Sequence, residues 1–258
     1  MLLSGATVAA LCGFAFLAGF TDSVVGGGGL IQVPALLLLL PGVPIPVLFG
    51  TNKLASAMGT VAAVRRYAGG LTMDWRIILP AAAASFGCSL LGAHAVSAIR
   101  PDTLRPVILV LLVAVALFTW RARDFGTVHA PRLHGAVALA AAVVMGGVLG
   151  FYDGFFGPGA GSFFIFVFVG VFGFDFLAAS AAAKVVNLGS NAAATLYFAG
   201  TGQILYLAAI PMGLASVAGA TLGSHLALTR GVRLIRAFFL VVVSILIAKL
   251  AWDTFRPG

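Results

Sequence analysis

The sequence predicts an all-α integral membrane protein built from two homologous halves. Of its 258 residues, 61% are hydrophobic and only 9% are charged. Soluble proteins carry charges on about a quarter of their residues, so this chain has too few to cover a surface exposed to water. The chain also matches itself when it is shifted by 131 positions. We therefore expect about 8–10 membrane helices, with short or re-entrant helices broken by glycine in each half.

The internal repeat is supported by matches between scarce residues and not by matches between apolar ones. Residues 19–118 align without a gap on residues 150–249, in a chain that has only three lysines and four histidines. The matched pairs of scarce residues are Asp22 with Asp153, Lys53 with Lys184, and His94 with His225. We interpret residues 1–258 as a single transmembrane domain, with repeat 1 at 1–125 and repeat 2 at 132–258. Such a duplication in a membrane protein is typical of a secondary transporter whose site lies where the halves meet.

Each half is expected to form five helical segments, because apolar runs alternate with short polar or glycine-rich connections. Those of the first half lie near 4–20, 28–40, 46–66, 76–98 and 104–121. Those of the second half lie near 135–151, 160–172, 177–197, 204–228 and 234–252. A membrane span needs about 20 residues, and the first two segments of each half are shorter. They are either short tilted spans or re-entrant hairpins, whose backbone must be satisfied by protein or by water.

The arginines favour an inverted repeat. Nine of the twelve lie in three clusters, namely Arg65, Arg66 and Arg76; Arg121, Arg123 and Arg132; and Arg230, Arg233 and Arg236. Short loops rich in arginine stay on the cytoplasmic side of a membrane. An odd number of crossings per half puts all three clusters on that side, with the halves in opposite orientations and both termini outside. A parallel arrangement of about eight spans is the alternative.

A glycine-rich segment follows the first helix of each half, at 19–29 and 150–161. Glycine allows the sharp turn, and the free N–H groups and positive dipole end of the next helix attract anions. Asp22 and Asp153 lie within these segments, which favours a binding function over close helix packing alone. The candidate substrate-binding residues here are Gly27, Gly28, Gly29, Gly159, Ala160 and Gly161.

A row of polar residues marks the third helix of each half. Lys53, Ser56 and Thr60 follow the spacing i, i+3, i+7, which places them on one helical face. Counting from Arg65, Lys53 lies about 18 Å into the helix, deep inside a hydrocarbon core of about 30 Å. The further candidate substrate-binding residues are Asn52 in the first half and Lys184, Asn187, Ser190 and Asn191 in the second.

Four ionisable groups at this depth must be paired or hydrated. Each costs about 2.5–3.5 kcal/mol at the centre of a span, so that all four unpaired would cost on the order of 10 kcal/mol, as much as the stability of a domain. We predict ion pairs within each half, Lys53 with Asp22 and Lys184 with Asp153. Purely structural ion pairs are the alternative interpretation.

Other polar residues carry weaker signals. Together with the two aspartates, His94 and His225 are candidates for proton coupling or ion pairing. We expect each histidine to hydrogen-bond to a neighbouring helix, and a proton relay is the alternative. Gln32 is a weaker candidate, whose counterpart is Phe163. We expect no metal site, because no Cys, His or acid stands at ligand spacing. No cofactor and no enzymatic activity are expected, and the net charge of +8 indicates lipid headgroups rather than nucleic acid as partners.

The chain resembles the TauE/SafE family of membrane transporters, also called the sulfite exporter family, and in particular its YfcA-like bacterial branch. The resemblance rests on Gly26 to Gly29 followed by Val33 and Pro34, on the string at 50–54, and on the string at 150–159. It implies a multi-pass permease of the bacterial inner (plasma) membrane that moves small anions such as sulfite, sulfonates or related organic acids.

These observations predict a secondary transporter of a small anion, coupled to protons, in which the two repeats alternate access to a central site. The expected partners are the anion, a coupling proton and membrane lipids. One alternative is a proton-coupled or cation-coupled carrier in which Asp22 and Asp153 bind the ion. An anion channel is a second alternative, and a membrane-embedded enzyme or assembly factor is the least favoured.

Overall fold

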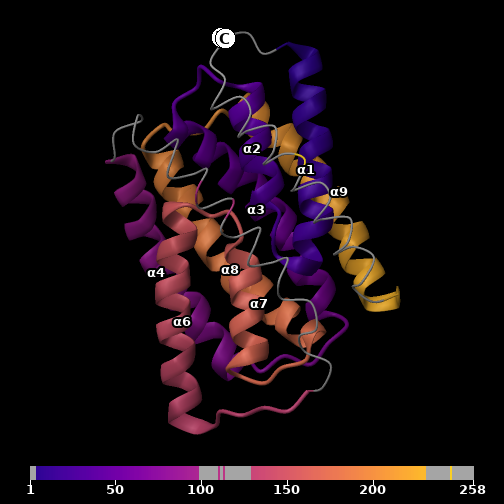
Figure 1. The fold of residues 1–258 in the computed structure, drawn as a ribbon, viewed down its shortest axis with the longest axis vertical. Coiled ribbons are helices and arrows are strands. Elements are labelled where there is room, and N and C mark those ends of the chain that lie inside the picture. Colours follow the sequence, from indigo (N-terminus) through magenta and orange to yellow (C-terminus); the bar gives the residue numbers. More distant parts are fainter. Residues whose placement is uncertain (1–3, 99–109, 111–112, 114–128, 231–244, 246–258) are drawn as a thin grey trace.

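The computed structural model describes residues 4–98, 110, 113, 129–230 and 245. Within these ranges the regular structure is entirely helical (Figure 1). The first half contains α1 (Gly5–Val25), α2 (Gly29–Leu39), α3 (Ile45–Ala68) and α4 (Trp75–Ser97). The second half contains α6 (Gly135–Phe155), α7 (Ala160–Gly170), α8 (Phe176–Gly200) and α9 (Tyr206–Arg230). The helices expected at 104–121 and 234–252, with most of the second and third arginine clusters, lie outside the described residues apart from isolated positions.

The all-helical membrane protein predicted from the sequence is confirmed. Five of the described helices, α1, α3, α4, α6 and α9, are long and apolar enough to cross a membrane. Helices α2 and α7 have 11 residues each, which gives them a length of about 16 Å, roughly half of the hydrocarbon core. Helix α8 has 25 residues and carries the polar row of the second half.

The predicted lengths of α1 and α6 were wrong. Both have 21 residues, so only the second segment of each half is short. Helix α1 continues through Asp22 because no residue before Gly26 requires a left-handed backbone; Gly26 has φ 77° and ends the helix. Helix α6 likewise continues to Phe155, and positive φ angles follow at Gly157 and Gly159. The two aspartates therefore lie in the last turns of helices and not in glycine-rich loops.

Each half packs its first and fourth helices against the other half. Helix α1 lies along α9, and α6 lies along α4, while α3 contacts both α8 and α9. In Figure 1, α1 runs downward from the top of the view and α6 runs upward from the bottom, so the two point in opposite directions. The two halves are thus interlocked instead of forming two separate bundles.

Glycines allow these helices to approach closely. A Cβ on Gly19 in α1 would lie 2.3 Å from the carbonyl oxygen of Ser216 in α9. The equivalent Cβ on Gly150 in α6 would lie 2.5 Å from the Cα of Ser85 in α4. The same contact therefore occurs twice, at positions related by the repeat, since small residues let backbones pack together in membrane helices.

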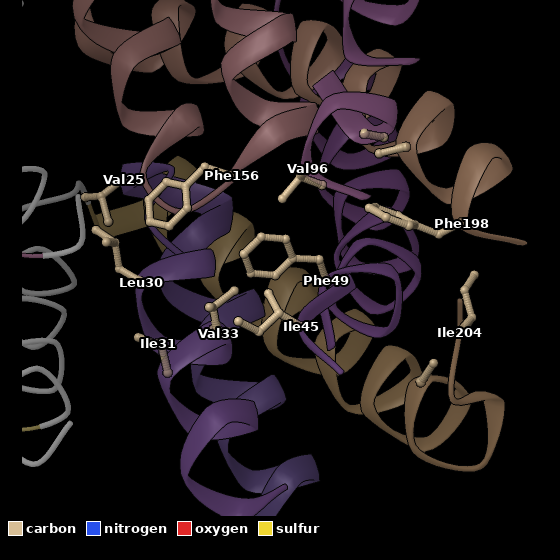
Figure 2. Packing of buried hydrophobic residues seen from close by; sticks show 14 of the residues in the cluster. Val25, Leu30, Ile31, Val33, Ile45, Phe49, Val96, Phe156, Phe198 and Ile204 are labelled. Carbon is tan, nitrogen blue, oxygen red and sulfur yellow. The ribbon is translucent and has the colours of Figure 1, made fainter. Parts of the chain in front are cut away.

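The largest apolar cluster lies between the halves, around the glycine-rich turns (Figure 2). Phe156 from the second turn meets Phe49 of α3 edge to face, with 6.3 Å between the ring centroids. Val25 and Leu30 flank the first turn and pack in the same cluster. The cluster thus joins residues of both halves beside the turns.

Candidate functional site

Two buried ion pairs join the two halves. The Nζ of Lys53 in α3 lies 2.7 Å from the Oδ1 of Asp153 in α6. The Nζ of Lys184 in α8 lies 2.6 Å from the Oδ2 of Asp22 in α1. Each lysine thus pairs with the aspartate of the other half.

The predicted pairing within each half was therefore wrong. The repeat makes the two aspartates equivalent in sequence, so that spacing does not choose between them. The choice is made by tertiary packing, because the last turn of α6 lies where Lys53 of α3 reaches Asp153, while α6 itself packs against α8. The prediction that the four charges are paired is confirmed, and loss of either partner would leave a buried charge uncompensated.

Asp153 is held by side chains on both of its oxygens. Besides Lys53 on Oδ1, Asn187 donates its Nδ2–H to Oδ2 at 3.0 Å, and the hydroxyl of Ser190 donates to the same oxygen. Asn191 donates to the Oδ1 of Asn187 at 3.0 Å, which fixes that amide. Only 2% of the Asp153 side chain is exposed. The carboxylate is thus fully enclosed and satisfied.

Asp22 has a different environment. Lys184 binds its Oδ2, and the backbone N–H of Gly28 donates to its Oδ1 at 3.0 Å. A Cβ on Gly28 would lie 2.6 Å from the Cβ of Asp22, so this approach requires glycine. The Asp22 side chain is 20% exposed, whereas Lys184 is fully buried. The two ion pairs therefore share their residue types but not their surroundings.

The two glycine-rich turns touch each other next to these pairs. The backbone N–H of Ser162 donates to the carbonyl of Gly26 at 3.0 Å, and its hydroxyl donates to that of Val25 at 2.7 Å. A Cβ on Gly26 would lie 2.2 Å from the carbonyl carbon of Gly161. The start of α7 thus faces a carbonyl of the first turn, and the two turns are in direct backbone contact.

Two small cavities lie at the ion pairs. The central cavity, about 20 Å³, is lined by Asp22, Gly26, Gly29, Asn52, Lys53, Ser56, Asp153, Gly157, Gly161, Asn187 and Asn191. The side cavity, about 10 Å³, is lined by Ala18, Gly19, Asp22, Ser23, Gly28, Gln32, Ser56, Gly59, Thr60, Ala63, Ser216 and Ala220. Each volume suits about one water molecule. Asp22 and Ser56 line both cavities.

Most of the predicted site residues are gathered here, and some are not. Gly27, Gly159 and Ala160 are close to the turns but line neither cavity. Lys184 and Ser190 also line neither cavity, although they bind Asp22 and Asp153. His94 and His225 are exposed near the ends of α4 and α9 and do not join the cluster.

The expected hydrogen bonds of the histidines to neighbouring helices are confirmed. The Nδ1 of His94 lies 3.2 Å from the hydroxyl of Tyr197, and that of His225 lies 2.8 Å from a guanidinium nitrogen of Arg66. Positions 66 and 197 are 131 apart, so the two contacts occupy equivalent places in the repeat. They join α4 to α8 and α9 to α3, which suits a structural function.

Ser216 of α9 was missed in the sequence. It lines the side cavity beside Gly19 and Gly59, and a Cβ on Gly59 would lie 2.2 Å from its hydroxyl. The signal that could have found it is the match of Ser85 with Ser216 in the repeat.

A larger cavity of about 720 Å³ lies away from the ion pairs, where α4 and α6 begin. Its lining is mainly apolar and contains none of the predicted site residues. Asp74 caps α4 through the backbone N–H of Arg76, and His129 pairs with Asp175 at 3.0 Å. Within the described ranges, no group of three His, Cys, Asp or Glu side chains could hold a metal ion.

The family model "Sulfite exporter TauE/SafE" matches residues 11–250. The chain belongs to the TauE/SafE family. It is 36% identical over 244 residues to the "Probable membrane transporter protein ORF9" of Sinorhizobium sp, covering 94% of this chain and 92% of that protein. It is 35% identical over 244 residues to the "Probable membrane transporter protein YfcA" of Escherichia coli K12, covering 93% and 88% of the two chains.

A third relative is the "Probable membrane transporter protein" of Haemophilus influenzae. It is 34% identical over 242 residues, and the alignment covers 92% of this chain and 92% of that protein. No solved structure matches the chain. Membership in the TauE/SafE family, the transporter relatives and the five spanning helices together identify a multi-pass bacterial membrane transporter and not an enzyme.

Proposed function

We propose that this TauE/SafE transporter carries a small anion through the cluster formed by the two crossed ion pairs. The observation that carries the proposal is the burial of two ammonium groups, Lys53 and Lys184, at the contact between the halves, each with a single carboxylate partner. A buried ammonium group must keep a negative partner, because an unpaired charge in a low-dielectric site is costly. A substrate anion can supply that charge in place of a carboxylate.

The chemistry of this exchange supports proton coupling. When an anion takes the place of Asp22 on Lys184, the displaced carboxylate is left without its cation. It is then neutralised by binding a proton, since burying it charged and unpaired costs far more. Anion and proton move together in this scheme, which accounts for the presence of paired acids beside the lysines.

The arrangement of the halves supports alternating access. Because each ion pair has one member in each half, a rocking motion of one half against the other stretches both pairs at once. The opposite directions of α1 and α6 in Figure 1 and the contacts duplicated at a spacing of 131 residues fit an inverted repeat within a single domain of residues 1–258. In that arrangement, equivalent elements of the two halves open the site to the two sides of the membrane.

The test is flux in proteoliposomes containing the purified full chain under an imposed pH gradient. The anions are sulfite, methanesulfonate and acetate, chosen because they differ in charge and in the number of oxygens. We expect uptake of at least one anion to follow the proton gradient. We expect the Lys53→Met/Lys184→Met variant to lose this flux.

The lysine variant leaves two buried carboxylates unpaired, so a neutral control is needed. The quadruple variant with Asp22→Asn and Asp153→Asn in addition contains no buried charge at the site and should still lack flux. Unchanged anion flux in both variants would defeat the proposal. A cation-coupled carrier predicts the opposite pattern, in which Asp22→Asn alone abolishes flux and the lysine changes are mild.

A further inference from the structure

The two ion pairs offer different opportunities to a ligand. The Asp153 carboxylate accepts from three side chains and is 2% exposed, whereas that of Asp22 accepts from Lys184 and Gly28 and is 20% exposed. Asp22 lines both cavities, while Asp153 lines only the central one. Removing the Asp22 carboxylate therefore disturbs fewer contacts and opens more space.

The first half also holds an unused donor. Gln32 in α2 is 1% exposed, and its Oε1 accepts from the hydroxyl of Ser56 at 3.2 Å. Its Nε2 is buried without any hydrogen-bond partner, although Gln32 lines the side cavity together with Asp22. A buried N–H group without a partner costs about 1–3 kcal/mol. This cost is removed when an acceptor arrives.

The second half has no equivalent donor. The position that corresponds to Gln32 is Phe163, which carries no polar side-chain atom. The amide of Asn187 is already used on both sides, since its Nδ2 donates to Asp153 and its Oδ1 accepts from Asn191. The unpaired buried amide donor of the described site thus lies on the side cavity with Asp22, whereas the unpaired atom of Asn52 at the central cavity is an acceptor.

We propose that the substrate anion replaces the carboxylate of Asp22 alone, and that Gln32 Nε2 binds the anion directly, while the Lys53–Asp153 pair stays formed during this binding step. This inference rests on the proposed anion transport. The cavities hold about one water each, so the space for an anion comes from the departure of the Asp22 carboxylate. Lys184 and the N–H of Gly28 then bind two of its oxygens.

Gln32 supplies the preference among anions. The Asp22 carboxylate has two oxygens, one on Lys184 and one on Gly28. A ligand with a third oxygen, such as a sulfonate, has one left for Gln32 Nε2, while a simple carboxylate does not. The loss of Gln32 should therefore weaken sulfonates more than carboxylates.

The first measurement is thermal unfolding of the purified full chain with methanesulfonate, at an ionic strength kept constant with gluconate. Asp22→Ala removes the carboxylate and leaves Lys184 without a partner, so methanesulfonate should bind in the vacated place and raise the melting temperature of this variant. Asp153→Ala should show no such rise, because the donors around that position stay enclosed. Adding Gln32→Leu to Asp22→Ala should remove most of the rise, whereas adding Gln203→Leu, a glutamine change in the connection that follows α8, should not.

The second measurement is flux in proteoliposomes with Gln32→Leu as the only change. The half-saturating concentration of methanesulfonate should increase about tenfold, as expected for the loss of one hydrogen bond to a charged group, while that of acetate changes less. Gln203→Leu is again the matched control.

The outcomes separate the two proposals. An equal rise for both aspartate variants, no rise for either, or flux unaffected by Gln32→Leu would overturn the assignment of Asp22 and Gln32, even if wild-type flux is normal. A rise confined to Asp22→Ala, and sensitive to Gln32→Leu, would support the anion site even if no flux is found, in which case only the transport function fails.

Discussion

Lys53 and Asp153 are 100 positions apart in the chain and meet at 2.7 Å with both side chains buried. Their repeat counterparts, Lys184 and Asp22, meet at 2.6 Å across the same interface. Because each pair connects the two halves, the charges that make up the site also hold the halves together. Any motion that separates the halves must exchange these partners for others.

The crossed pairing predicts which second change rescues a damaged lysine position. Lys53→Met leaves Asp153 buried without its cation and should lower the free energy of unfolding by about 3–5 kcal/mol. Adding Asp153→Asn should restore most of this loss, since no buried charge is then left unpaired at that pair. Thermal unfolding in detergent measures both variants.

Asp22→Asn is the matched comparison for this rescue. Combined with Lys53→Met, it should lower stability further, because it leaves Lys184 without its partner. If Asp22→Asn rescued Lys53→Met better than Asp153→Asn did, the crossed pairing would be refuted.

The contact between the two turns predicts a strong effect at Gly26. Gly26 has φ 77°, and an alanine Cβ there would lie 2.2 Å from the backbone of Gly161. Gly26→Ala should therefore combine backbone strain of about 1–2 kcal/mol with an overpacking cost of about 1–3 kcal/mol. We also expect reduced flux, because the first turn positions Asp22.

Gly202 separates these two causes. It has φ 70°, but a Cβ there would meet nothing within 4 Å. Gly202→Ala should show the backbone strain alone, with flux near the wild-type level. Equal losses of stability in the two variants would show that the contact between the turns contributes nothing.

The close crossing of α4 and α6 predicts that Gly150 does not tolerate alanine. A Cβ there would lie 2.5 Å from the Cα of Ser85, which cannot move without shifting α4. Gly150→Ala should destabilise the protein by about 1–3 kcal/mol. Gly87→Ala, on α4 with open space around it, should be neutral or stabilise by up to about 1 kcal/mol. A similar melting temperature for both would argue against this packing.

The positions of the histidines predict that they are not needed for transport. His94 and His225 are exposed and bonded to Tyr197 and Arg66, away from both cavities. The variant His94→Gln/His225→Gln should keep flux within about twofold of wild type, with the same response to pH, because neither ring reaches the ion pairs. Loss of the pH response in proteoliposomes would instead revive the proton relay as an explanation.

Much of this protein could be predicted from its composition and its repeat. The low share of charged residues fixed the membrane class, and the matches of Asp22 with Asp153 and Lys53 with Lys184 identified the charged residues of the site. The position of Lys53 deep within its helix then placed these charges inside the membrane. They had to be paired or hydrated, because the cost of burying all four alone approaches the stability of a domain. None of these steps needed the arrangement of the helices.

The helix bounds were harder to predict from the sequence, because a glycine in a membrane protein can either allow close helix packing or form a turn. Gly19 and Gly150 serve close helix packing within α1 and α6, whereas Gly26 ends a helix with a positive φ. Sequence alone does not distinguish a glycine that packs from one that turns, so the aspartates were assigned to loops when they lie in helices.

Chemistry and repetition were thus determined by the sequence itself, while the partner of each charge was decided only by the tertiary structure. Duplication offers every lysine two equivalent aspartates, and spacing along the chain does not choose between them. The packing of the helices brings the aspartate of the other half to each lysine, at 2.7 Å and 2.6 Å. The same packing places Gln32 beside Asp22 and Asn187 beside Asp153, which makes two nearly identical motifs physically different.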